Sequence, residues 1–202
     1  MNVEKMIKRD ISVVIANYLT NNLTCYEKKN IDDEKTYETN FLHLMNVIGK
    51  NVINIPRKVH YSRELIKKMN EEFPKELCDL IKLFEKKFDK GESVKGYLSK
   101  KAFDVEFKDI LLNQWGIKHL HLTDKEANSI EEMKNNRSNI LLFFFVDNQD
   151  VYFLDVRKHP KGAGYITIDG WRNLVHGRWR GLLTFSLKSI QMRNFINFIK
   201  MA

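Results

Sequence analysis

The sequence has few cysteines, no flexible linker and no long hydrophobic run, and each shortage excludes a class of protein. Cys25 and Cys78 are far apart, lack the Cys-x-x-Cys spacing of zinc sites and are too few for a disulfide framework. The longest apolar run, 140–146, is much shorter than the roughly 20 residues that a membrane-spanning helix needs. No apolar leader follows Met1, so we expect a soluble, cytoplasmic protein without a membrane partner.

Acidic residues are scarce at the C-terminal end of the chain. The whole chain has 34 lysines and arginines against 26 acidic residues, which gives a net charge of +8. From Arg157 to Ala202 there are nine basic residues and a single acid, Asp169, so this segment carries the entire excess and residues 1–156 are neutral. Such an asymmetry indicates a polyanionic partner, and we predict that this partner is RNA.

Hydrophobic periodicity predicts an α+β protein, in which a helical N-terminal half is followed by a small antiparallel sheet packed with helices. The clearest helices lie on either side of Pro74. Ser62 can cap the first of them, and Gly91 can end the second. We therefore divide the chain into a mainly helical region, 1–95, and an α+β region that faces RNA, 96–202, although the two can also form one continuous domain.

A β-hairpin is the strongest prediction for the second half. Segments 140–146 and 151–157 are rich in β-branched and aromatic residues, and the polar segment 147–150 joins them. A Thr-x-x-Glu spacing, typical of a capping box, predicts a short helix over 123–136.

Two histidines alternate with leucines shortly before the hairpin. If this segment is a strand, His119 and His121 project from one face, while Leu120 and Leu122 face the core. Neighbouring imidazoles can bind a metal, act as an acid and a base, or bind phosphate when protonated, with Lys118 as an additional cation. Histidines that only form hydrogen bonds at a sheet surface are equally compatible with this pattern.

Basic and titratable residues gather at the exit of the hairpin. RNA cleavage without a metal needs a base for the 2′-hydroxyl, an acid for the leaving oxygen and cations for the charged phosphorane. His159 can supply the acid or the base, and Arg157, Lys158 and Lys161 can supply the charge. The alternative is a solvated basic turn.

Tryptophans are interleaved with basic residues in segment 171–180. Indole rings stack on unpaired bases, and guanidinium groups contact phosphates, so this segment is a candidate RNA contact unless its tryptophans are buried in a core. Its candidate residues are Trp171, Arg172, His176, Arg178, Trp179 and Arg180.

Segment 137–159 resembles the last strands of RelE-type toxins, in which a basic residue precedes an apolar strand, a short polar turn and a second strand with a basic tail. The resemblance implies a metal-independent mRNA endoribonuclease that acts on the ribosome and is neutralised by an antitoxin. By resemblance, Arg137, Arg157 and His159 match the family's cationic and acid/base positions. The family's opening strand and helical pair have no counterpart directly before Arg137 in the sequence.

Three functions are compatible with these residues. The first is a metal-independent endoribonuclease of toxin or phage-defence type. It needs no cofactor, uses the residues that the resemblance assigns together with His119 and His121, and has an antitoxin or another defence-system protein as a partner. The second is a nucleic-acid-binding protein without catalysis. The third is a metal-dependent hydrolase, in which the histidine pair and His159 or Asp155 bind the metal.

Overall fold

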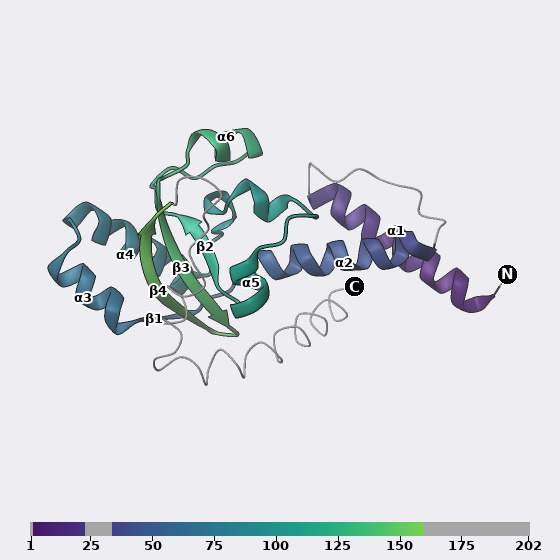
Figure 1. The fold of residues 1–202 in the computed structure, drawn as a ribbon, viewed down its shortest axis with the longest axis horizontal. Helices are drawn as coiled ribbons and strands as arrows, with labels where there is room; N and C mark the ends of the chain where they lie inside the picture. The colour runs from purple at the N-terminus through teal and green to yellow at the C-terminus, as the bar shows by residue number, and fades with distance from the viewer. Residues whose placement is uncertain (1, 23–33, 160–202) are drawn as a thin grey trace. The chain divides into compact units, whose positions relative to one another are not determined.

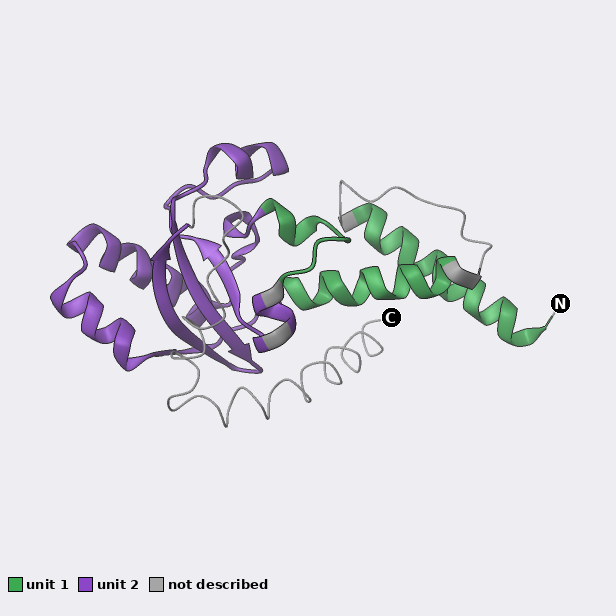
Figure 2. Ribbon diagram, in the orientation of Figure 1, with its two compact units in different colours: residues 1–51, 100–109 green, residues 52–99, 110–202 purple. Residues whose placement is uncertain are grey.

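The structure, a computed structural model, describes residues 2–22 and 34–159 and divides into two compact units. The helical unit contains residues 1–51 and 100–109, and the sheet unit contains residues 52–99 and 110–202 (Figure 2). Residues 52–95, which the sequence analysis groups with the N-terminal region, thus belong with the sheet. The helices and strands in chain order are α1 (Val3–Asn22), α2 (Glu34–Lys50), β1 (Lys58–Tyr61), α3 (Arg63–Glu71), α4 (Lys75–Lys90), η1 (Lys95–Tyr97), η2 (Lys100–Phe103), α5 (Ile110–Trp115), β2 (Lys118–His121), α6 (Ile130–Asn135), β3 (Ile140–Asp147) and β4 (Asp150–Lys158).

The helical unit is built on the contact between α1 and α2. Ile15 and Leu19 of α1 and Leu44 of α2 are fully or almost fully buried, as expected for helices that pack through an apolar stripe. Ser12 and Asn40 are also buried, and their side chains form a hydrogen bond with each other (3.1 Å), so these polar groups are satisfied.

The sheet unit contains a mixed four-stranded sheet with the strand order β1-β4-β3-β2 (Figure 1). The β3–β4 hairpin is confirmed, and β2 pairs antiparallel with β3 as the prediction of an antiparallel sheet requires. The short strand β1, which the sequence analysis did not predict, pairs parallel with β4 and makes the sheet mixed. The α+β class with a helical N-terminal half is confirmed.

The predicted pair of helices around Pro74 is confirmed as α3 and α4. Ser62 caps α3 by accepting a hydrogen bond from the backbone N–H of Leu65 (2.9 Å), and Pro74 is the N-cap residue of α4. Gly91 ends α4 in the left-handed conformation (φ 69°), which favours glycine.

The short helix predicted over 123–136 begins later than its Thr-x-x-Glu spacing indicated. Ser129, not Thr123, is the N-cap of α6 and accepts from the backbone N–H of Glu132 (3.1 Å). Thr123 instead accepts from the backbone N–H of Lys125, which makes a local turn. Ser129 and Glu132 have the same capping spacing as Thr123 and Glu126, and the helix begins at this second pair.

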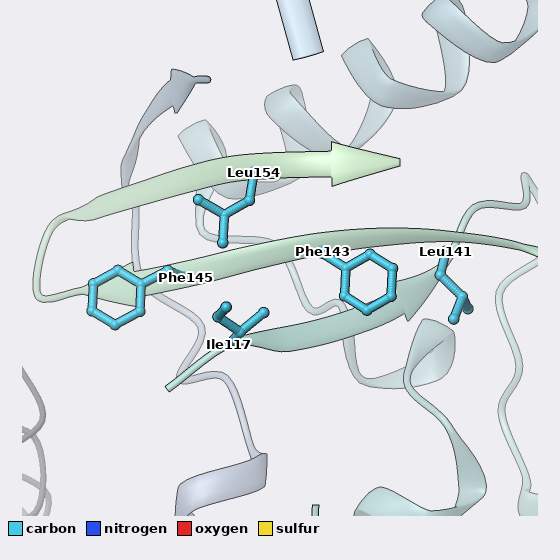
Figure 3. Packing of buried hydrophobic residues seen from close by; sticks show 5 residues of the cluster. All are labelled: Ile117, Leu141, Phe143, Phe145 and Leu154. Atoms are coloured by element: carbon cyan, nitrogen blue, oxygen red, sulfur yellow. The ribbon is translucent and has the colours of Figure 1, made fainter. Parts of the chain in front are cut away.

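Both faces of the sheet carry apolar side chains. On one face, Phe88 of α4 packs against Phe144 and Phe153, with ring centroids 5.4 and 5.7 Å apart. The opposite face has a cluster of buried side chains shown in Figure 3, against which Leu111, Trp115 and Tyr152 pack. Its members are Ile117, Leu141, Phe143, Phe145 and Leu154.

None of the helices in ranges 2–22 and 34–159 is both long enough and apolar enough to cross a membrane.

Candidate functional site

The register of the sheet brings two predicted site residues to one face. His121 pairs with Leu141, and Leu141 pairs with Arg157 on the next strand. Residues that lie directly opposite each other project from the same face, so His121 and Arg157 flank Leu141. In the adjacent row, His119 pairs with Phe143, and their rings are 5.8 Å apart. The prediction that the two histidines share a face is confirmed, but this face is also part of the core.

His159 lies beside the segment that leads into β3. Its backbone N–H donates to the carbonyl of Asn139 (2.6 Å), which brings the end of β4 next to the start of β3. The imidazole of His159 stacks on that of His121, with ring centroids 6.1 Å apart and an interplanar angle of 7°. His159 and Arg137 are exposed, whereas His121 is only 5% exposed, so the first two form the rim of this cluster.

The ring of His121 has a defined tautomer. Its Nδ1 lies 2.8 Å from the carbonyl oxygen of Ser138, and because a carbonyl only accepts, Nδ1 carries the proton and donates it. In the neutral ring Nε2 therefore has the lone pair, and no hydrogen bond from the described residues reaches it. The arrangement leaves one nitrogen of His121 able to accept a proton.

Burial lowers the pKa of His121 to about 4. The hydrogen bond to Ser138 acts in the opposite direction, and the positive charges of His119, Arg137 and His159 lower the pKa further. His121 is thus neutral at pH 7. These interactions place His119, Arg137 and His159 within electrostatic reach of His121, and the strand register places Arg157 on the same face, across Leu141. We call His119, His121, Arg137, Arg157 and His159 the basic cluster.

Arg157 of the basic cluster is held by a buried carboxylate that the sequence analysis considered only as a metal ligand. Asp155 is 0% exposed, and its Oδ2 accepts from Nε of Arg157 (2.6 Å). Its Oδ1 accepts from Nζ of Lys68 on α3 (2.7 Å) and from the backbone N–H of Val156 (2.8 Å). A carboxylate inside an apolar strand signals that cations lie nearby, although the sequence does not show which ones.

The remaining predicted contacts are not part of the basic cluster as described. Lys118 pairs with Phe144, and Lys158 pairs with Ile140, so strand alternation directs both lysines to the face opposite His121 and Arg157. The other predicted contacts lie outside the described residues, namely Lys161, Trp171, Arg172, His176, Arg178, Trp179 and Arg180.

Within the described part of the chain, no three or more histidine, cysteine, aspartate or glutamate side chains form a group that could hold a metal ion. A metal site at His119 and His121 would therefore need ligands from residues that the structure does not describe.

Comparisons of the chain with protein-family models, with curated proteins and with solved structures found no match.

Proposed function

We propose that the chain binds single-stranded RNA at the basic cluster and cleaves it without a metal. The observation that carries this proposal is the stacked pair His121 and His159 at one end of the sheet, with Arg137 within electrostatic reach of His121 and Arg157 on the same face, across Leu141. Such a set contains a proton acceptor, a proton donor and cations for a phosphodiester, which are the groups that metal-free RNA cleavage requires.

The proposed reaction is an attack of the RNA on its own backbone. Nε2 of His121 accepts the proton of a 2′-hydroxyl, and the 2′-oxygen forms a bond to the adjacent phosphorus. The bond from phosphorus to the 5′-oxygen breaks, and protonated His159 gives its proton to that oxygen. Arg137 and Arg157 stabilise the charge on the phosphorane. The products are a 2′,3′-cyclic phosphate and a 5′-hydroxyl.

The low pKa of His121 has two consequences for this reaction. The ring is neutral and ready to accept a proton at pH 7, but a group with a pKa of about 4 is a weak base. Burial is the largest cause of the low pKa, and the neighbouring cations add to it. The negative charge of a bound phosphodiester acts against the effect of these cations and so favours the protonated form of His121.

The order of elements in the sheet unit also supports the proposal. RelE-type toxins have an opening strand and a helical pair, and β1 followed by α3 and α4 are elements of this kind, at 58–90 and not directly before Arg137. On the basis of this resemblance, the proposal extends to an mRNA-cleaving toxin of RelE type or a phage-defence nuclease, with an antitoxin or another defence-system protein as the partner.

RNA binding without cleavage is the second candidate function, and the burial of His121 favours it. His121 is only 5% exposed and has a pKa of about 4. Both properties are also expected of a histidine that has a structural role beneath a cationic surface. In that case His159 and the arginines would contact phosphates, and affinity would fall steeply with salt while no product forms.

The test is incubation of end-labelled single-stranded RNA with the purified chain, with and without EDTA. We expect cleavage by the wild type and a loss of roughly 100-fold or more in rate for His159→Ala, since a positioned acid or base contributes about that much. His60→Ala is the matched control, because His60 belongs to β1 and binds Asp150, not the basic cluster. Binding without product would favour the second candidate. Cleavage that EDTA abolishes would contradict the metal-free mechanism.

A further inference from the structure

Asp155 is a buried carboxylate near the end of β4 that contacts two cationic side chains. Its carboxylate is fully buried and accepts from one backbone N–H and from two cationic side chains, Lys68 and Arg157. Counted by themselves, one carboxylate and two cationic side chains carry a charge of +1. The side chains of Lys68 and Arg157 are each about 30% exposed, at 29% and 31%, so this charge lies at the surface.

The contact also determines how the guanidinium of Arg157 is oriented. The guanidinium group is planar, so a short bond from Nε to Asp155 fixes its plane and the direction of its Nη groups. Asp155 therefore acts on Arg157 as a carboxylate acts on a ligating histidine, by holding a functional group in one orientation. Lys68 contacts the other oxygen of Asp155, so Arg157 shares this carboxylate with a second cation.

We propose that Asp155 and Lys68 are positioning residues, which hold Arg157 in the orientation that binds a phosphate of the RNA backbone. This inference rests on the proposed function, because it assumes that the basic cluster binds RNA. It adds a residue from α3 to a site that otherwise consists of β2, β4 and the segments around them. It also assigns a role to a carboxylate that would by itself repel RNA.

The positioning role and simple electrostatics predict opposite changes in the RNA affinity of Asp155→Asn. Asp155→Asn removes a negative charge near the site, so electrostatics alone predicts tighter binding of RNA. Loss of orientation predicts weaker binding, by roughly tenfold, because a charge-assisted hydrogen bond that held Arg157 is weakened. In an Arg157→Ala background, Asp155→Asn is expected to cause no further weakening, since Asp155 acts through Arg157.

The experiment measures the affinity of each variant for a 2′-O-methyl single-stranded oligonucleotide, which lacks the attacking hydroxyl, by fluorescence anisotropy at several salt concentrations. Asp150→Asn is the matched control, because it makes the same substitution at the other end of β4, where Asp150 binds His60. We expect this control to bind as tightly as the wild type or slightly tighter. If Asp155→Asn does not fold, Lys68→Met is the second variant. It leaves Asp155 to offset the charge of Arg157 alone, so it is expected to weaken binding in the wild type but not in the Arg157→Ala background, where a lysine that acts by its own charge would still matter.

Tighter or unchanged binding of folded Asp155→Asn would overturn the inference, as would an equal weakening in the Arg157→Ala background. If Asp155→Asn does not fold, unchanged affinity of Lys68→Met would overturn it. Absence of binding by the wild type would overturn both the inference and the proposed function. If Asp155→Asn weakens RNA binding in the wild type but not in the Arg157→Ala background, the inference is supported. If the wild type then fails to cleave RNA, only the cleavage step is refuted.

Discussion

Acid is expected to destabilise the sheet unit through His121. In the unfolded chain a histidine has a pKa of about 6.5, whereas burial lowers the pKa of folded His121 to about 4. Between these values the unfolded state binds more protons, so the free energy of unfolding falls as the pH decreases through this window. The contribution is fully present above pH 6.5. It amounts to about 3 kcal/mol in total, of which about 2 kcal/mol is lost between pH 7 and pH 5.

The assay is urea denaturation at pH 7 and at pH 5 for the wild type and for His121→Asn. Asparagine cannot be protonated, and its amide can still donate to the carbonyl of Ser138, so the hydrogen bond is retained. The variant is expected to be less stable than the wild type at pH 7 but to lose about 2 kcal/mol less on acidification. His60→Asn is the matched control, since it retains His121 and the steeper loss that depends on it.

Equal losses in the wild type and His121→Asn would refute this reasoning. So would an NMR titration of the wild type that places the pKa of His121 near 6.5, because the ring would then not be desolvated as its burial indicates.

Three further substitutions test the fold by urea denaturation at pH 7. Ser62→Ala is expected to cost about 1–2 kcal/mol, because it removes the cap of α3 at Leu65 as well as a second buried hydrogen bond; a neutral change would contradict the cap. Gly91→Ala is expected to cost more than about 1 kcal/mol, since its φ is 69° and a Cβ atom would lie 2.6 Å from the nitrogen of Pro56; equal stability would contradict this close approach. Phe153→Ala is expected to cost about 3–5 kcal/mol, because the ring is fully buried against α4; a loss below 1 kcal/mol would mean that this face is not packed as described.

The elements that the sequence predicts correctly are those with local signals. The β3–β4 hairpin has two β-rich runs and a polar turn, in which Asn148 adopts a positive φ of 51° that asparagine tolerates. The pair α3 and α4 has a serine cap, a proline at its break and a glycine at its end. In each case the residues that determine the element lie inside it or directly next to it.

The elements that the sequence does not predict depend on distant partners. Strand β1 has only four residues, and its pairing with β4 joins Lys58 to Asp150, far along the chain. No local pattern marks such a strand, because its stability comes from the partner and not from its own periodicity. The start of α6 is ambiguous in the sequence for a different reason, because Thr123 and Ser129 have the same capping spacing and only the fold selects Ser129.

The site was predictable in part. The hairpin brings Arg137 near His159, because the turn places the two ends of its strands side by side. The burial of His121 was not predictable, since it follows from apolar side chains on the second face of the sheet. Asp155, between Leu154 and Val156, gave a usable signal of a buried ion pair, but its partner Lys68 comes from a helix that no pattern connects to this strand.

The most direct test of the central claim compares two oligonucleotides of one sequence in EDTA, one of RNA and one carrying 2′-O-methyl groups throughout. Attack by the 2′-hydroxyl predicts that the wild type cleaves only the RNA and that the new 3′ ends are 2′,3′-cyclic phosphates, detected by mass spectrometry. Cleavage of both oligonucleotides, or of neither while both are bound, would contradict the claim that the basic cluster cleaves RNA in this way.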